Sequence, residues 1–322
     1  MAYLGLDIGA TNAKAVLLSD GGDGIADVSV PTLPGGDGVV KSALVATAEL
    51  FATTGLTASD LVSIGIGVPG VVDSAAGTVA HAVNLGITAD RYPLAARLSA
   101  ELGAPAVLAN DLDIAALGAY HLYGSDVNDL AFISLGTGLA AGFIINGSLY
   151  AGHGSVGEIG HIPVVENGIP CFCGQRGCLE RYCSGSALDK LWPALPGVPA
   201  PRALFEAAAA GNSEAVALVN QYCYHLAIAI RNLILTTGPQ LVVIGGGVVR
   251  LGAPLLNGVK AALTELAAPS EFLQSLNMAD RVILADTDTP VAAIGAAIMG
   301  RDFVTDLNKS QNENVLNQLV NS

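Results

Sequence analysis

The sequence predicts an α/β protein of two lobes that contain two copies of one structural unit. Its 322 residues are too many for one compact core and suit two. A strand–turn–strand pattern occurs twice, and so does a buried strand that ends in glycines. Apolar residues make up 52% of the chain and aromatic residues only 5%, which fits closely packed strands and helices joined by glycine-rich turns.

The first repeated pattern is a hairpin. Residues 6–18 and 133–145 each read as a strand, a turn of small residues and a second strand. Residues 61–67 and 241–247 form the second pair, in which a helical stretch precedes a buried strand that ends in glycines. Glycine after a strand is common, so a chance likeness between the copies stays open at this level.

Between these strands, the periodicity of apolar residues predicts helices at 40–54, 93–102, 112–122, 186–191, 202–209 and 213–236. We place a small lobe at residues 1–115 and a large lobe with a metal-binding loop at 116–289. A C-terminal helix at about 290–322, rich in small residues at its start, is expected to pack back on the small lobe. Its polar end is either frayed or disordered.

Composition excludes several classes of function. The longest apolar stretches, such as 241–249, are interrupted by glycines and too short to span a bilayer, and the N-terminus has no basic start typical of a signal peptide. The net charge of -14 repels nucleic-acid backbones and anionic lipid. We therefore expect a cytoplasmic protein with no membrane and no nucleic-acid partner.

The two hairpin turns are candidate phosphate sites. In the first turn, Gly9 lets backbone N–H groups approach an anion, Thr11 and Asn12 add donors, and Asp7 can hold Mg²⁺ through water. An ordinary turn capped by Asp7 is the alternative. In the second turn, Thr137 and Gly138 can cradle phosphates from the opposite lobe.

Asn110 and Asp111 stand between an apolar run and a helical pattern, at a strand-to-helix junction. Such junctions often line ligand sites in α/β proteins. A carboxylate there can accept the proton of a hydroxyl group whose oxygen attacks a γ-phosphate. The alternative is that Asp111 only caps the following helix.

Five cysteines are present, and four of them crowd together. His161 with Cys171, Cys173 and Cys178, in a glycine-rich loop, is typical of a closed tetrahedral zinc site with a structural role. Cys183 is the competing fourth ligand, and unligated thiols are the alternative.

The zinc segment carries two glutamates, Glu158 and Glu180. A bound metal would pin both ends of the segment, so these carboxylates are suited to accept hydrogen bonds from sugar hydroxyls. His161 can bind metal through one ring nitrogen and a ligand through the other. Solvated surface glutamates are the alternative.

The segment Gly65-x-Gly67-x-x-Gly70, which follows a strand, also fits the glycine spacing of a dinucleotide-binding motif. We discard it because Pro69 and Gly70 prevent the helix that the motif must open. The segment is instead expected to be a loop near a ligand.

Taken together, these motifs resemble the repressor–ORF–kinase (ROK) family of sugar kinases and sugar-responsive repressors. The matching segments run from Asp7 to about Gly300. They are Asp7-x-Gly9-x-Thr11, Gly67-Val68-Pro69-Gly70, Asn110-Asp111, Gly136-Thr137-Gly138, Glu158-x-Gly160-His161 and Cys171-x-Cys173-Gly174-x-x-Gly177-Cys178-x-Glu180.

The resemblance implies an actin-like (ribonuclease H-like) fold, a duplicated two-lobe ATPase with a cleft between its lobes. It implies ATP, Mg²⁺ and a structural Zn²⁺, a small-molecule sugar, and assembly as a homodimer or homotetramer. Asp111 would be the catalytic base. The implied sugar contacts are Gly70, Asn84, Asn110, Asp111, Glu158, His161 and Glu180. The implied nucleotide contacts are Asp7, Gly9, Thr11, Asn12, Thr137, Gly138, Gly245, Gly246 and Gly247, and the implied zinc ligands are His161, Cys171, Cys173 and Cys178.

This chain departs from the family pattern near the sugar and phosphate sites. Asn12 stands where relatives usually have Lys, and Lys14 is not clearly its equivalent. Asp113 replaces an Asn, and Ile87 follows the Asn84-Leu85-Gly86 segment where many glucokinases carry Trp. These departures bear on which hexose is bound more than on the chemistry.

The expected function is ATP-dependent phosphorylation of a hexose, with the 6-hydroxyl of glucose as first choice. The alternatives within this class are N-acetylmannosamine, N-acetylglucosamine, fructose, mannose, allose or a cyclitol as acceptor, and polyphosphate as donor. A sugar-sensing repressor is a second class, disfavoured by the acidic charge and by the first turn beginning at Asp7 with no helix-turn-helix ahead of it. A dinucleotide-dependent oxidoreductase is the third.

Overall fold

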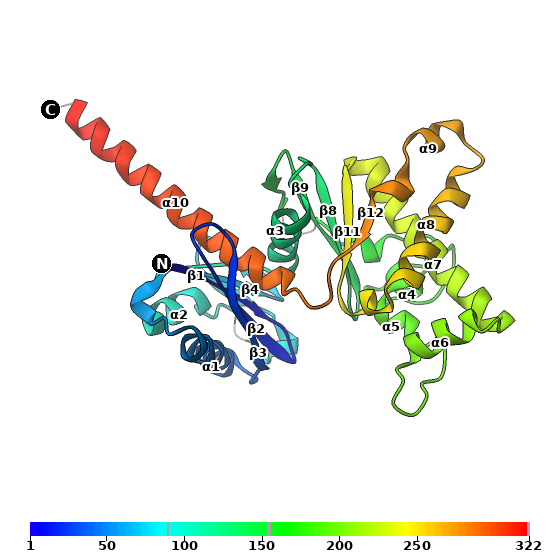
Figure 1. Ribbon diagram of the computed structural model, residues 1–322, viewed down its shortest axis with the longest axis horizontal. Helices are drawn as coiled ribbons and strands as arrows, with labels where there is room; N and C mark the ends of the chain where they lie inside the picture. The colour runs from blue at the N-terminus through cyan, green and yellow to red at the C-terminus, as the bar shows by residue number, and fades with distance from the viewer. Residues whose placement is uncertain (89, 153–155, 321–322) are drawn as a thin grey trace. The chain divides into compact units, whose positions relative to one another are not determined.

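The computed structural model describes residues 1–88, 90–152 and 156–320, and it divides the chain into two compact units (Figure 1). The first unit contains residues 1–123 together with 290–322, and the second contains residues 124–289. The boundary expected after residue 115 falls inside helix α3 (Asp111–Tyr123), so the division lies at the end of that helix instead.

The first unit is built on a five-stranded sheet in the order β3-β2-β1-β4-β7. The strands β1, β2 and β3 pair antiparallel, whereas β4 and β7 run parallel to β1. Their bounds are β1 Ala2–Ile8, β2 Asn12–Leu18, β3 Gly24–Pro31, β4 Leu61–Val68 and β7 Ala106–Asn110. A small hairpin of β5 (Val71–Asp73) and β6 (Thr78–Ala80) follows β4, so the glycine segment after β4 opens no helix.

The second unit repeats this plan. Its sheet has the order β10-β9-β8-β11-β12, with β8 and β9 antiparallel and β11 and β12 parallel to β8. The bounds are β8 Leu130–Leu135, β9 Leu139–Ile145, β10 Ser148–Leu149, β11 Leu241–Gly245 and β12 Val282–Leu284. The duplication expected from the two hairpins is therefore real, and both hairpins lie at corresponding places in their sheets.

The helices of the first unit pack against its sheet. They are α1 Gly36–Thr54, α2 Leu94–Leu102, α3 and α10 Val291–Val320. The helix α10 (orange to red in Figure 1) packs against α3, β1 and β4. Glycines make this close approach possible, since a Cβ on Gly118 of α3 would overlap the Val291 carbonyl oxygen, and one on Gly65 would overlap that of Ala296.

Helices of the second unit surround a separate core. They are α4 Glu180–Cys183, α5 Gly185–Leu188, α6 Ala200–Ala209, α7 Ser213–Thr237, α8 Ala253–Ala267 and α9 Glu271–Ser275. The helix α7 ends one residue beyond its expected range; Asn212 caps its start and Gly238, in the left-handed conformation, ends it. Within the described part of the chain, no helix is both long and apolar enough to cross a bilayer.

Candidate active site and metal centre

The carboxyl ends of three parallel strands meet at one edge of the first sheet. Asp7 of β1 lies beside Gly67 of β4, and Gly67 lies beside Ala109 of β7. One step further along β7 come Asn110 and then Asp111, the first residue of α3. This register gathers Asp7 and Asp111, which are more than a hundred residues apart in the chain, at one edge.

The junction between β7 and α3 holds Asn110 and Asp111 in place. The Leu112 N–H donates to Oδ1 of Asn110 at 2.9 Å and to Oδ1 of Asp111 at 3.1 Å. The Asn110 amide also donates to the Gly70 carbonyl oxygen at 3.4 Å, which ties the loop after β4 to this junction. Asp111 therefore does interact with the helix start, as the capping alternative requires, and the same bonds orient its carboxylate.

Asp7, Asp111 and Asp113 share this edge, and burial together with repulsion from Asp111 raises the pKa of the other two. Burial first, and then the charge of Asp111, raise the pKa of Asp7 to about 6, while Lys14 acts in the opposite direction. Burial and Asp111 also raise the pKa of Asp113. A cation held here would relieve that repulsion, so the donor set fits Mg²⁺, which prefers carboxylate oxygens.

The first hairpin turn has the geometry of an ordinary turn, because the Gly9 N–H donates to the Asn12 carbonyl oxygen at 3.0 Å. Thr11 and Asn12 are nonetheless exposed on it. Asn84 lies in the short helix η2 (Val83–Leu85) and is exposed, and no contact between it and Asn110 is seen among the described residues.

The second hairpin turn is fastened to the helices that follow the metal loop. The Gly136 carbonyl oxygen accepts the Gly185 N–H at 2.9 Å, and the Thr137 carbonyl oxygen accepts the Ser186 hydroxyl. Glu180, half-buried at the start of α4, accepts the Leu139 N–H at 3.3 Å. A Cβ on Gly138 would come within 2.6 Å of Oε2 of Glu180, so the glycine allows the carboxylate to reach the turn.

A cavity of about 1070 Å³ opens beside this second turn. It is at the upper end of the range for small-molecule sites, about 300 to 1,000 Å³. Of the nucleotide contacts implied by the sequence, Thr137 and Gly247 line it. Gly245 and Gly246 serve packing, since added Cβ atoms would strike the Phe132 ring and the Leu135 carbonyl oxygen. The remaining walls include Pro201, Phe205, Pro254, Arg202, Arg250 and Thr287.

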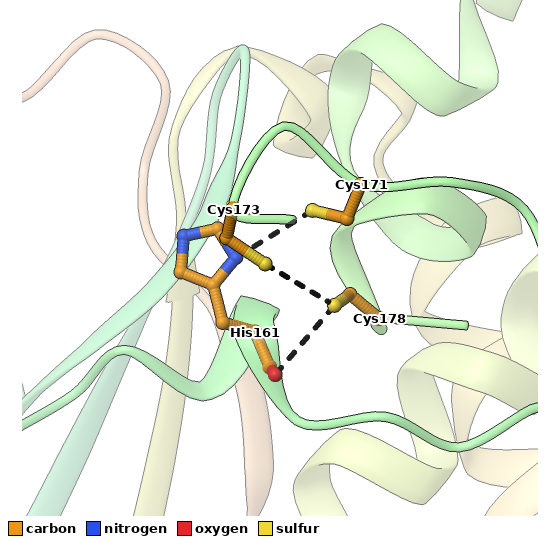
Figure 2. A group of neighbouring side chains, drawn as sticks. All are labelled: His161, Cys171, Cys173 and Cys178. Atoms are coloured by element: carbon orange, nitrogen blue, oxygen red, sulfur yellow. Dashed lines mark hydrogen bonds between the residues drawn. The ribbon is translucent and has the colours of Figure 1, made fainter. Parts of the chain in front are cut away.

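Four side chains of the second unit converge as the sequence predicted. The ligand atoms of His161, Cys171, Cys173 and Cys178 all lie within 4.8 Å of one another (Figure 2). His161 ends the short helix η3 (Ile159–His161), and the cysteines come from the loop before α4. Backbone bonds close that loop, among them Cys171 N–H to the Gln175 carbonyl oxygen at 2.8 Å.

The spacing of these atoms fits zinc. Ligand atoms at about 2.0 to 2.3 Å from a tetrahedral zinc lie about 3.4 to 3.8 Å apart. Sγ of Cys173 and Sγ of Cys178 are 3.7 Å apart, and so are Sγ of Cys171 and Nδ1 of His161. The Gln175 backbone, then its side chain, lower the pKa of Cys173 to about 6, whereas burial raises that of Cys178 to about 12. A metal would displace the proton held by Cys178.

The two ring nitrogens of His161 face different neighbours. Nδ1 points toward Cys171, while Nε2 lies 3.8 Å from Oε2 of the exposed Glu158. Cys183 is not part of the group; it is buried in α4 and its thiol donates to the Leu179 carbonyl oxygen at 3.4 Å. The first-choice ligand set is thus the one that the structure brings together.

Sequence reasoning missed several residues of this region. Ser186, whose hydroxyl fastens the second turn, and the cavity residues Arg202, Phe205 and Arg250 carry no local motif. They come from α5, α6 and η4 (Gly247–Leu251), which only the tertiary fold brings together.

Known proteins are similar to this chain in sequence and in fold. A profile of the "ROK family" matches residues 3–302. A glucokinase of Halalkalibacterium halodurans is 34% identical over 287 residues, covering 83% of this chain and 86% of that protein. An N-acetylmannosamine kinase of Salmonella arizonae is 31% identical over 273 residues, covering 84% and 90%. Among solved structures, a ROK family glucokinase of Streptomyces griseus in complex with glucose and AMPPNP superposes with a TM-score of 0.75 at 28% identity, covering 94% of this chain and all of that one.

Proposed function

The chain belongs to the ROK family, and on that premise we propose that it transfers the γ-phosphoryl group of ATP to the 6-hydroxyl of glucose. It is a sugar kinase with the actin-like, two-lobe ATPase fold that the sequence implied. Glucose and ATP are supported by the glucokinase relatives and by the glucose–AMPPNP complex of the Streptomyces griseus enzyme.

One structural observation carries the assignment of roles, the position of Asp111 at the carboxyl end of β7. Two backbone-anchored contacts fix this junction, so the carboxylate is oriented before a ligand binds. We assign Asp111 as the general base. As the sugar hydroxyl oxygen bonds to the γ-phosphorus, its proton passes to Asp111, and the bond from phosphorus to the leaving ADP oxygen breaks.

Sugar recognition is proposed for Asn110 beside Asp111, with Gly70 and Asn84 on the adjoining loops, and for Glu158, His161 and Glu180 on the metal-stapled segment. His161 supports this role because Nε2 faces away from the cysteines, toward Glu158. Carboxylates and an imidazole held on a crosslinked segment can form hydrogen bonds with several sugar hydroxyl groups and lose little conformational entropy on binding.

Zinc bound by His161, Cys171, Cys173 and Cys178 would crosslink a loop that has little core of its own. We propose a structural role, since four protein ligands would fill a tetrahedral coordination sphere and leave no position for water. The loop continues directly into α4, where Glu180 touches the second hairpin turn. Because His161 is both a proposed ligand and a proposed sugar contact, loss of the metal should disturb the sugar contacts directly and the second turn only through Glu180.

The nucleotide is proposed to bind at the two hairpin turns and the cavity. Gly9, Thr11, Asn12, Thr137 and Gly138 would meet the phosphates, and the Gly245–Gly247 segment with the cavity would take the adenosine. The apolar surface of Pro201, Phe205 and Pro254 suits a flat base. Asp7 would hold Mg²⁺, which neutralises phosphate charge when bound.

The test is a coupled ADP-release assay over a panel of sugars, with ATP and with polyphosphate as donors. Wild-type protein should favour glucose with ATP, and Asp111→Asn should lose about 10² to 10⁴ in kcat while still binding glucose. Near-normal turnover by Asp111→Asn would remove Asp111 from the mechanism. Preference for another acceptor would correct the substrate, and the kinases among the relatives make N-acetylmannosamine and N-acetylglucosamine the first alternatives to try.

Two further proposals come from the family resemblance alone. We propose a cytoplasmic protein that assembles as a homodimer or homotetramer. Light scattering behind size-exclusion chromatography measures the mass of the assembly directly, and a mass of one chain would refute it.

A further inference from the structure

The side chain of Tyr182 joins the metal loop, residues 162–179, to the helix that carries Glu180. Tyr182 lies in α4, two residues after Glu180 and four after Cys178. Its hydroxyl oxygen accepts the Ile169 N–H at 2.8 Å, from a residue 13 positions earlier in the chain. This bond ties the middle of the metal loop to the helix at which the loop ends.

Ile169 is held through both of its backbone polar groups. Its N–H donates to Tyr182, and its carbonyl oxygen accepts the Gly177 N–H at 2.9 Å. Cys171 follows Ile169 by two residues, and Cys178 follows Gly177 directly. The two bonds at Ile169 therefore place these two cysteines relative to α4.

The loop leaves room for the Tyr182 hydroxyl at Gly168. A Cβ on Gly168 would overlap Oη of Tyr182, and it would come within 3.0 Å of the Gly177 Cα. The backbone of Gly168 is not in the left-handed region, so its conformation does not by itself call for glycine. The close approach of the hydroxyl and the neighbouring loop backbone is what requires a residue without a side chain here.

The ring of Tyr182 is fixed from the other side by α7. It stacks on the ring of His225, with centroids 4.7 Å apart and an interplanar angle of 22°. His225 is buried in the core of the second unit, and its Nδ1 lies 2.8 Å from the Gln221 carbonyl oxygen. Stacked rings have a preferred geometry, so the core orients the hydroxyl that holds the loop.

We propose that Tyr182 is a positioning residue, which holds the metal loop in the conformation that brings the zinc ligands together and orients Glu180 and His161 for the sugar. This role rests on the proposed kinase function and metal centre. A loop that is ordered before its ligands bind loses less conformational entropy on binding. Without the bond to Ile169, zinc should leave faster and the sugar should bind more weakly, whereas phosphoryl transfer, which Tyr182 does not touch, should continue at its usual rate.

The test compares wild type, Tyr182→Phe and the matched control Tyr224→Phe. Phenylalanine keeps the stacked ring and removes only the hydroxyl. Zinc release from the zinc-loaded variant into EDTA should be at least about twofold faster and KM for the sugar at least about twofold higher, with smaller changes in kcat and in KM for ATP, since one hydrogen bond has an effect of that order.

Tyr224→Phe should behave as wild type. Tyr224 is exposed and meets the His225 ring edge-on at 5.8 Å, and its hydroxyl has no hydrogen bond among the residues that the structure describes. The two variants thus remove the same atom from two tyrosines that contact the same histidine, and only one of these hydroxyls reaches the metal loop.

A second variant, Gly168→Ala, tests the contact from the side of the loop. Its added Cβ would overlap the Tyr182 hydroxyl, so it should speed zinc release in the wild-type background. In the Tyr182→Phe background the overlapping atom is gone, and the same substitution should have a smaller effect.

Three results would each overturn the proposed role of Tyr182. They are a change of less than about twofold in either zinc release or sugar KM for Tyr182→Phe, a loss in kcat as large as the rise in KM, and an equal effect of Gly168→Ala in both backgrounds. KM is measured on the sugar that the wild-type protein turns over fastest. Failure of glucose would count against the proposed substrate, and wild-type protein that binds no zinc would count against the metal centre. The KM and kcat ratios would then decide the role of Tyr182 alone.

Discussion

Replacing Asp7 by Asn should stabilise the protein at neutral pH. Burial, and then the charge of Asp111, raise the pKa of Asp7 from 3.8 to about 6. A rise of that size corresponds to about 3 kcal/mol of lost stability once the carboxyl is ionised. Because Asp7 is only half-buried, we expect a gain of about 1 to 3 kcal/mol from the neutral, nearly isosteric Asn.

The sign and the pH window follow from the direction of the shift. Below pH 3.8 the carboxyl is protonated in both folded and unfolded chains, so it costs nothing there. As the pH rises toward 6, the unfolded chain releases its proton before the folded chain does, and the folded state loses stability. The advantage of Asp7→Asn over wild type should therefore be small near pH 4.5, grow through pH 6 and level off above about pH 7.

The assay is calorimetric unfolding of both proteins between pH 4.5 and 8, without added Mg²⁺ or nucleotide. The transition of the first unit should rise by several degrees at pH 7.5, since each kcal/mol shifts Tm by about 2 to 4 °C in a unit of this size. Asp27→Asn is the matched control, because Asp27 is exposed on strand β3 of the same sheet, and it should change Tm little at any pH.

A pH-independent difference between Asp7→Asn and wild type, or a lower Tm for the variant at pH 7.5, would refute the reasoning. A second comparison separates the two causes. In an Asp111→Asn background the repulsion is gone and burial remains, so the gain from Asp7→Asn should shrink without vanishing. An unchanged gain would mean that Asp111 does not act on Asp7.

Three further outcomes are expected. Cys178→Ser should abolish zinc binding, measured by elemental analysis, and raise KM for glucose more than KM for ATP, whereas Cys183→Ala should keep about one zinc per chain. Gly118→Ala should destabilise the first unit by about 1 to 3 kcal/mol in denaturant unfolding, although Ala favours helices by about 1 kcal/mol, because its Cβ would meet the α10 backbone. Gly24→Ala, with open space around it, should be neutral. Gly247→Val should raise KM for ATP about tenfold by filling the cavity, and an unchanged KM would place the base elsewhere.

The duplicated sheets could be predicted because strand periodicity and glycine turns are local signals. Both hairpins and the strand at 61–67 are found as expected, and the strand expected at 241–247 ends at Gly245, where the chain turns into η4. The expected helix 40–54 in fact begins at Gly36, since Gly35 in the left-handed region lets the chain turn into it early. The return of α10 to the first unit depends on Gly5, Gly65 and Gly118, which lie in three separate segments and meet its backbone, and only a small-residue composition hinted at this.

The cluster of His161 and three cysteines was predictable for the same reason, since three of its four residues fall within eight residues of sequence. The cavity was not, because its walls come from the second turn, α6 and η4, and no local spacing relates Arg202 to Thr137. Pairs of residues that are brought together by strand register are only partly predictable. Asp7 and Lys14 are visible in the sequence, but only the pairing of β1 with β2 shows that they share a face.

The differences between the two copies explain how one framework supplies two kinds of surface. In the first sheet, Gly67 pairs with Ala109 of β7, and Asp111 follows two residues later. In the second sheet, the register of β11 and β12 continues to Gly245 and Ala285, and Thr287 of the cavity wall follows two residues later. A carboxylate at 287 would repel phosphates, whereas a carboxylate at 111 is needed to accept a proton. Duplication fixed the backbone in both units, and the copies then diverged at the carboxyl ends of equivalent strands.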